Sequence, residues 1–258
     1  TEPYVNNPLR VSRVSEDHVA AQKNKDGWMD LCLVLDSIEN KQDEKFTSAV
    51  FQQVLIEVFR ALAETSVQYP VPLRISHPSC VRLTESFLTD RAGGDRVQAV
   101  AGALFVLIGK RFGIYDEVRR AATNAADAAT GLVADLECVS RKQGVVLAVE
   151  VKDRELTIAQ IDSKLISARS KKVQEILFVT QKGVKSSERK KLPDKIEAEF
   201  AAGQNIYITN LQSLMEAVFA LMPESGRPEF LRLVGAQLEE FKSNIRHRRA
   251  WSSLLEKA

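Results

Sequence analysis

Two apolar runs near the middle of the chain, residues 132–139 and 145–151, are separated by a short polar segment at 140–144. Short apolar runs bounded by a polar turn are typical of a β-hairpin, whose adjacent strands lie about 4.8 Å apart. Because residues two apart on a strand point to the same face, Glu150 and Lys152 are expected to emerge together. The opposite face of the second strand is expected to pack through Val145, Leu147, Val149 and Val151.

Charged residues occur at matching places in this hairpin. Asp135 lies in the first run, and Glu150 and Lys152 close the second, so that pairing can bring two carboxylates and a lysine to one site. Magnesium binds carboxylate oxygens and keeps several waters, so one or two carboxylates suffice to hold it. A metal of this kind assists phosphodiester hydrolysis, and a lysine can orient the attacking water or hold a phosphate oxygen. The alternative is that these charges form a solvated ion pair at an exposed strand end, which contributes little to stability.

The pattern Asp135, loop, Glu150-Val151-Lys152 resembles the PD-(D/E)xK nuclease superfamily, although Ala134 stands where the family pattern has proline. Over roughly residues 85–222 the chain also resembles SacI-type type II restriction endonucleases. The segments that carry this looser resemblance are Gly93-Gly94-Asp95-Arg96, Asn124 to Ala129, Val149 to Asp153, and Ile206 to Asn210. The resemblance implies a Mg²⁺-dependent deoxyribonuclease that cuts double-stranded DNA, with Asp135 and Glu150 as metal ligands and Lys152 as a catalytic residue.

A helix is predicted at 157–171, after the Glu-x-Lys strand. Its apolar residues recur at helical spacing, at Ile158, Ile161, Leu165 and Ala168. In many nucleases of this superfamily the equivalent helix lines the active site. The resemblance therefore implies a catalytic role for Gln160 first, and a contact of Lys164 with substrate phosphate second; a solvated helix face is the alternative.

Strands and helices alternate after this point. The periodicity predicts strands at 175–181 and 205–209, a basic helix at 186–202 interrupted by Pro193, and a helix at 210–222 with Asn210 as its N-cap. Strands that alternate with helices imply a mixed sheet with helices on both faces. The expected fold class is therefore α/β, with a mixed central sheet flanked by helices and an N-terminal helical subdomain.

The domain boundaries follow from the same periodicity. Residues 1–90 are expected to form the helical subdomain, used for recognition or dimerisation, and residues 91–222 the nuclease core. The tail 223–258 is expected to contain one C-terminal helix. Upstream helices are predicted at 17–40, 44–66, 79–89 and 95–112, and the second has an apolar stripe at Phe51, Leu55, Val58, Phe59 and Leu62.

Basic residues cluster although the formal net charge is only +2. The candidates for phosphate contact follow the strand 175–181, because their loop leaves the sheet that carries the motif; they are Lys182, Lys185, Arg189 and Lys190. A solvated charged surface is the alternative. In the polar loop 121–130, Asn124 and Asp127 could contact DNA bases, as Asn does with adenine, or hold a turn through side-chain to backbone bonds.

Several classes of protein are disfavoured. No apolar run approaches the length of a membrane span, and the first residues lack the apolar core of a signal peptide. Cys32, Cys80 and Cys138 form neither a zinc pattern nor a disulfide framework, so a cytoplasmic location is expected. The chain also lacks a glycine-rich phosphate loop, so no nucleotide cofactor is expected.

The sequence therefore predicts a magnesium-dependent restriction endonuclease that acts on double-stranded DNA. Because cutting both strands usually requires two active sites, a homodimer is expected. One alternative is a repair or recombination nuclease of the same fold. The other is a DNA-binding module of a defence complex that does not cleave; the intact Asp135, Glu150 and Lys152 argue against it.

Overall fold

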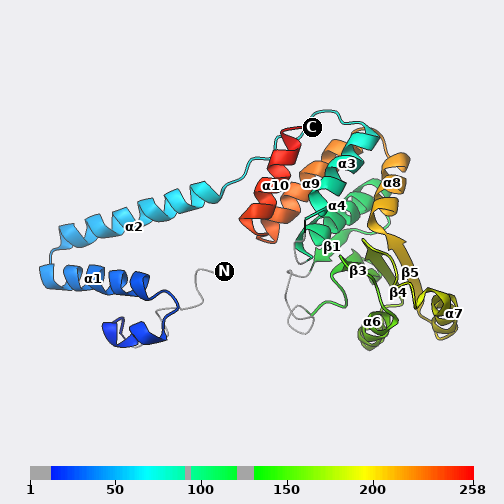
Figure 1. Ribbon diagram of the computed structural model, residues 1–258, viewed down its shortest axis with the longest axis horizontal. Helices are drawn as coiled ribbons and strands as arrows, with labels where there is room; N and C mark the ends of the chain where they lie inside the picture. The colour runs from blue at the N-terminus through cyan, green and yellow to red at the C-terminus, as the bar shows by residue number, and fades with distance from the viewer. Residues whose placement is uncertain (1–12, 91–93, 121–130) are drawn as a thin grey trace. The chain divides into compact units, whose positions relative to one another are not determined.

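The computed structural model describes residues 13–90, 94–120 and 131–258. They belong to two compact units, Thr1–Ser66 and Val67–Ala258 (Figure 1). Throughout the described ranges, every helix is too short or too polar to cross a membrane.

The first unit contains the 3₁₀ helix η2 (Glu16–Ala21) and the helices α1 (Lys25–Lys41) and α2 (Glu44–Thr65). The single helix predicted at 17–40 is wrong, because Asn24 starts a new helix by accepting a hydrogen bond from Gly27 N at 3.0 Å. Trp28 is buried and donates its Nε1–H to Ser15 O at 2.9 Å, which holds η2 against α1. Four residues of the apolar stripe predicted on α2 are exposed, namely Phe51, Leu55, Val58 and Phe59, and the side chain of the fifth, Leu62, lies outside what the structure describes.

The second unit is built on a five-stranded mixed sheet in the order β1-β2-β3-β4-β5. The strands are β1 (Glu117–Arg120), β2 (Leu136–Ser140), β3 (Gly144–Lys152), β4 (Glu175–Thr180) and β5 (Asn205–Asn210). The pairs β1–β2 and β2–β3 are antiparallel, whereas the pairs β3–β4 and β4–β5 are parallel. The predicted hairpin and the mixed α/β class are confirmed. β1 was not predicted, because Glu-Val-Arg-Arg is short and charged and becomes a strand only by pairing with β2.

Helices cover both faces of this sheet (Figure 1). One hydrophobic cluster joins the sheet to α3 (His77–Leu88), α4 (Asp95–Phe112), α8 (Leu211–Leu221), α9 (Gly226–Glu240) and α10 (Ile245–Leu255). The other joins it to α6 (Ile158–Ser170) and α7 (Leu192–Ala201). Glu150 and Lys152 are in register with Ala148, whose side chain lies in the second cluster, so they emerge on the α6 face.

The hairpin contains a β-bulge, and because of it the predicted face of Val145 is wrong. Cys138 pairs with Leu147, but Val139 pairs with Val145, which leaves Val146 as the extra residue. An extra residue exchanges the faces of the side chains before it. Val145 therefore packs in the α6 cluster, while Leu147 and the valines beyond it pack against α4 as predicted.

Two predicted helices differ in their bounds. Pro193 does not interrupt a helix but lies in the first turn of α7, where its missing N–H costs nothing. The tail forms two helices instead of one, because Lys242 adopts a left-handed φ of 50° and Asn244 then caps α10. The other predicted elements lie within a few residues of their observed bounds, and Asn210 caps α8 as expected.

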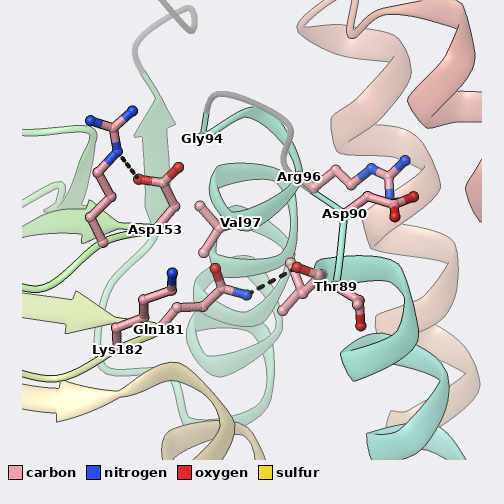
Figure 2. Close-up of a pocket in the computed structure, with 10 residues that line it drawn as sticks. Thr89, Asp90, Gly94, Arg96, Val97, Asp153, Gln181 and Lys182 are labelled. Carbon is pink, nitrogen blue, oxygen red and sulfur yellow. Dashed lines mark hydrogen bonds and ion pairs between the residues drawn. The ribbon is translucent and has the colours of Figure 1, made fainter.

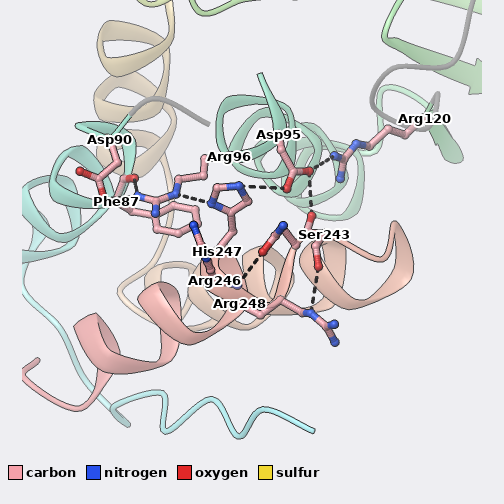
Figure 3. Close-up of polar contacts among 10 residues, drawn as sticks. Phe87, Asp90, Asp95, Arg96, Arg120, Ser243, Arg246, His247 and Arg248 are labelled. Carbon is pink, nitrogen blue, oxygen red and sulfur yellow. Dashed lines mark hydrogen bonds and ion pairs between the residues drawn. The ribbon is translucent and has the colours of Figure 1, made fainter. Parts of the chain in front are cut away.

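A polar network fastens α10 to the first turn of α4 (Figure 3). Arg96 Nε donates to His247 Nδ1 at 2.9 Å, and Ser243 Oγ donates to Asp95 Oδ1 at 2.8 Å. Arg96 also donates to Phe87 O at 2.7 Å and is only 7% exposed. These bonds fix the N-terminal turn of α4, which carries a side chain of the candidate site.

Candidate active site

The β2–β3 hairpin brings Asp135, Glu150 and Lys152 together. Leu136 pairs with Val149 across the hairpin, so the residue before β2 lies beside Glu150. Val151 N donates to Asp135 Oδ2 at 2.8 Å, and Lys152 Nζ lies 2.5 Å from Glu150 Oε1. The sequence predicted this grouping from the alternation of the strand and the length of the turn.

Glu150 is buried, at 4% exposure, and two lysines face its carboxylate. Lys152 Nζ contacts Oε1, and Lys164 Nζ from α6 lies 2.9 Å from Oε2. The contact with Lys164 is an ion pair, and Oε2 accepts no hydrogen bond from the described residues. The side chain of Lys152 is 27% exposed and that of Lys164 only 9%, so Lys152 is the cation that a substrate can reach.

Asp135 is held by two hydrogen bonds. Besides the Val151 amide, Gln98 Nε2 on α4 donates to its Oδ1 at 2.8 Å. Burial and the neighbouring Glu150 carboxylate raise the pKa of Asp135 to about 6, against the opposing effects of the Val151 N–H and the two lysines. Two carboxylates that repel each other in a partly buried site favour a cation between them.

Gln98 was missed by the sequence reasoning. It lies 37 residues before Asp135, far outside the hairpin motif. One signal was available: between Val97 and Ile108, Gln98 is the only polar side chain in an otherwise apolar segment of α4. A polar side chain in such a segment needs a partner, and Asp135 provides it.

The donor atoms at this site fit a hard divalent cation. Asp135 and Glu150 offer carboxylate oxygens, and Glu150 Oε2 still has hydrogen-bonding capacity that the described residues leave unused. Across the described residues, no three or more His, Cys, Asp or Glu side chains gather as a metal cluster. A site of two carboxylates suits Mg²⁺, which keeps several waters, and does not suit zinc.

The two α6 candidates have different partners in the structure. Gln160 is the N3 residue of a capping box: its Oε1 accepts from Thr157 N at 3.0 Å, and its N donates to Thr157 Oγ1 at 3.3 Å. It is exposed, and its carbonyl oxygen serves the helix end. Lys164, one turn later, is the α6 residue that reaches Glu150. Its side chain is 9% exposed and is directed at Glu150.

The basic residues after β4 lie along the carboxyl ends of the parallel strands. Leu156 N donates to Gly183 O at 2.9 Å, and Lys185 N donates to Leu156 O at 2.9 Å, so the loops after β3 and β4 are joined. A hollow of about 490 Å³ between them is lined by Arg154, Glu155, Thr157, Lys182 and Lys185. Ligands of α/β sheets commonly bind at this edge.

The other predicted nucleic-acid contacts are placed less directly. Arg189 and Lys190 lie in the short helix η3 (Arg189–Lys191); both are exposed, and Arg189 Nε donates to Val184 O at 2.9 Å. Asn124 and Asp127 lie outside the described residues.

A larger hollow of about 710 Å³ opens between the end of α3, the start of α4 and the loops after β3 and β4 (Figure 2). It lies next to the carboxylate site, because Asp153 follows Lys152 and Val97 precedes Gln98. Gln181 Nε2 crosses it to donate to Leu88 O at 3.3 Å. Arg96, Arg154 and Lys182 also line it, and so do Asp90 and Asp153, which pair with Arg96 and Arg154 respectively.

Comparison with known protein families adds an independent finding. A model of the SacI restriction endonuclease C-terminal domain matches residues 74–183, and one of the SacI restriction endonuclease N-terminal domain matches residues 1–59. The first match contains Gln98, Asp135, Glu150, Lys152 and Lys164. A search of curated proteins found no match.

Proposed function

Because the chain belongs to the SacI restriction endonuclease family, whose members are restriction-type DNA nucleases, we propose that it hydrolyses double-stranded DNA with Mg²⁺ held by Asp135 and Glu150. The observation that carries this proposal is the meeting of these two carboxylates with Lys152 at the end of the hairpin. The site lies inside the matched segment 74–183.

The roles of the side chains follow from their burial and partners. When bound, Mg²⁺ would neutralise phosphoryl oxygens and lower the pKa of a coordinated water. Lys164 holds Glu150 Oε2 from the buried side, and Gln98 holds Asp135 Oδ1. Lys152, the more accessible of the two lysines, can turn from Glu150 toward the scissile phosphate or the attacking water.

Charge distribution supports DNA binding by the second unit. Residues 67–258 carry 29 basic and 23 acidic side chains, whereas residues 1–66 carry seven basic and eleven acidic ones. Lys182, Lys185 and Arg154 place cations around the two hollows beside the site. We assign the phosphate contacts to this edge, with Arg189 and Lys190 as further contacts, and expect affinity to fall steeply with salt.

Cleavage of both strands at one site needs two active sites. The simplest source is a homodimer with two-fold symmetry, which matches the symmetry of a palindromic DNA site. The proposed enzyme is therefore a homodimeric endonuclease.

The test uses purified protein with unmethylated phage DNA and magnesium chloride. Asp135→Asn and Lys152→Met remove one metal ligand and the reachable cation, while changing the volume of the side chain little. Glu175→Gln is the matched control: it removes a carboxylate at the opposite end of β4 but keeps an acceptor for Asn205 Nδ2, now 2.6 Å from Glu175 Oε1.

Discrete fragments from the wild type and Glu175→Gln, but not from the two site variants, are expected. A smear that both site variants abolish would indicate a nuclease without sequence preference. Cleavage that survives Asp135→Asn would refute the assigned site. Salt-sensitive binding without cleavage by the wild type would refute the enzymatic proposal in favour of a binding module.

A further inference from the structure

Helix α2 carries an apolar surface that the other described residues of its own unit leave uncovered. Phe51, Val54, Leu55, Val58 and Phe59 follow the spacing i, i+3, i+4, i+7, i+8, which places them on one side of a helix. Their exposed fractions are 62, 50, 51, 50 and 71%. We refer to these five side chains as the α2 apolar face.

The opposite side of α2 carries hydrogen-bonded polar side chains beside Ile56, which is 45% exposed. Gln53 Nε2 donates to Glu57 Oε1 at 2.6 Å, and Arg60 donates to the same oxygen at 2.7 Å. The helix is therefore amphipathic in the usual sense, with its polar side in solvent. Among the described residues of this unit, its apolar side lacks the protein contact that such a stripe normally has.

The surface area of the α2 apolar face is large enough for one side of a small protein–protein interface. Taking roughly 150–200 Å² for each large side chain, the exposed fractions leave about 500 Å² of apolar surface. That is near the upper end of the largest patch found on typical monomers, about 300–600 Å². Two such faces placed together would bury about 1,000 Å² in total, which reaches the lower bound of a specific protein interface.

The charge of the first unit excludes DNA as the occupant. Residues 1–66 carry an excess of four acidic side chains, which repels phosphate. The occupant must therefore be an apolar protein surface.

A second α2 is the surface that fits. In the described part of the unit Val67–Ala258, the exposed large apolar side chains are spread over separate elements: Leu73, Phe112, Ile114, Ile166, Phe200, Tyr207 and Leu221. Scattered residues of this kind make no matching stripe. A two-fold axis, by contrast, brings identical patches together, so that the apolar face of one copy meets that of the other.

We infer that two copies of this chain associate through the α2 apolar face. This inference rests on the proposed homodimer, but its test measures molecular mass and not cleavage. A monomer that still cleaves DNA would therefore overturn the α2 interface and leave the proposed cleavage chemistry intact. Each substitution in the face enters the symmetric interface twice, which doubles its effect.

The experiment measures the mass of the full chain by light scattering and by sedimentation over a dilution series. The wild type is compared with Phe59→Asp and Leu55→Asp. Gln53→Asp is the matched control, because it places the same carboxylate on the polar side of the same helix. Since Phe59 and Leu55 are more than half exposed, the folded chain should tolerate the change, and a circular dichroism melt verifies this.

The wild type and Gln53→Asp are expected at twice the chain mass of 28.7 kDa, and the two face variants at the single-chain mass. The dimer dissociation constant should rise at least about 100-fold in the face variants, as for central interface residues. A wild type of single-chain mass throughout would overturn the inference, and so would a Phe59→Asp protein that stays dimeric. A Phe59→Asp protein that only melts at a lower temperature would show that the face packs on its own chain, which also overturns it.

Discussion

Replacing Gln98 by leucine removes the amide that fixes the Asp135 carboxylate while keeping the size of the side chain. The Gln98 Nε2 to Asp135 Oδ1 bond of 2.8 Å has a charged acceptor, and such bonds contribute about 1.5–3 kcal/mol. Asp135 keeps its bond from Val151 N, so we take the lower end of that range. At about 1.4 kcal/mol for each factor of ten, the apparent affinity for Mg²⁺ should fall about tenfold. Loss of a partner that orients a metal ligand typically costs 10–100-fold.

Two measurements test this expectation. The magnesium dependence of DNA cleavage should shift to about tenfold higher concentration in Gln98→Leu, with the maximal rate changing less. Isothermal titration of Mg²⁺ into the protein without DNA should show the same shift. Gln212→Leu, an exposed substitution on α8, is the matched control and should leave both unchanged. A folded Gln98→Leu protein with wild-type magnesium affinity would refute the reasoning, because Asp135 would then be positioned without the amide.

Three further substitutions test the stability of the site and its supports. Lys164→Met should lower the free energy of unfolding by about 2–3 kcal/mol in a urea titration, because buried Glu150 loses one of its two cations; an unchanged midpoint would contradict the buried ion pair. Thr157→Ala should cost about 1 kcal/mol by removing the capping box of α6, again measured with urea. Burial, together with the Arg96 cation, lowers the pKa of His247, so the unfolded chain takes up the proton first. The contribution of neutral His247 to the free energy of unfolding is therefore complete above about pH 6.5 and is lost as pH falls below that value. The stability difference between the wild type and His247→Gln should shrink on acidification, and a pH-independent difference would show that His247 does not titrate differently in the folded state.

The elements that the sequence predicts well are those with local signals. The bounds of α4 were predicted as observed, because Asp95 begins an uninterrupted apolar period that Gly113 ends with a left-handed φ of 66°. Asn210 was recognised as a cap because Asn is a preferred N-cap residue. In the structure its side chain accepts hydrogen bonds from Gln212 N and Ser213 N. The errors within the sheet concern features that long-range pairing decides. β1 exists only beside β2, and the face of Val145 depends on a bulge that no alternation pattern contains.

The candidate site divides in the same way. Asp135, Glu150 and Lys152 were within reach of sequence reasoning, because one hairpin holds all three and its alternation fixes their sides. Gln98 was not, because it reaches Asp135 only after α4 packs on the sheet and α10 fixes its first turn. Its place as the only polar side chain between Val97 and Ile108 indicates that it has a polar partner, but the spacing of residues does not identify that partner as Asp135.

The local partner of Gln160 on α6 was, in contrast, predictable from the sequence. They lie four residues apart on one stripe of α6, so periodicity alone cannot separate them. Thr157-Ile-Ala-Gln160, however, has the form of a capping box, in which the N3 glutamine bonds back to the start of the helix. That role occupies the glutamine carbonyl at the helix end, and the next residue on the stripe is the lysine that contacts Glu150. A side chain with a local partner at a helix start is therefore a weaker candidate for a site than its neighbour one turn later.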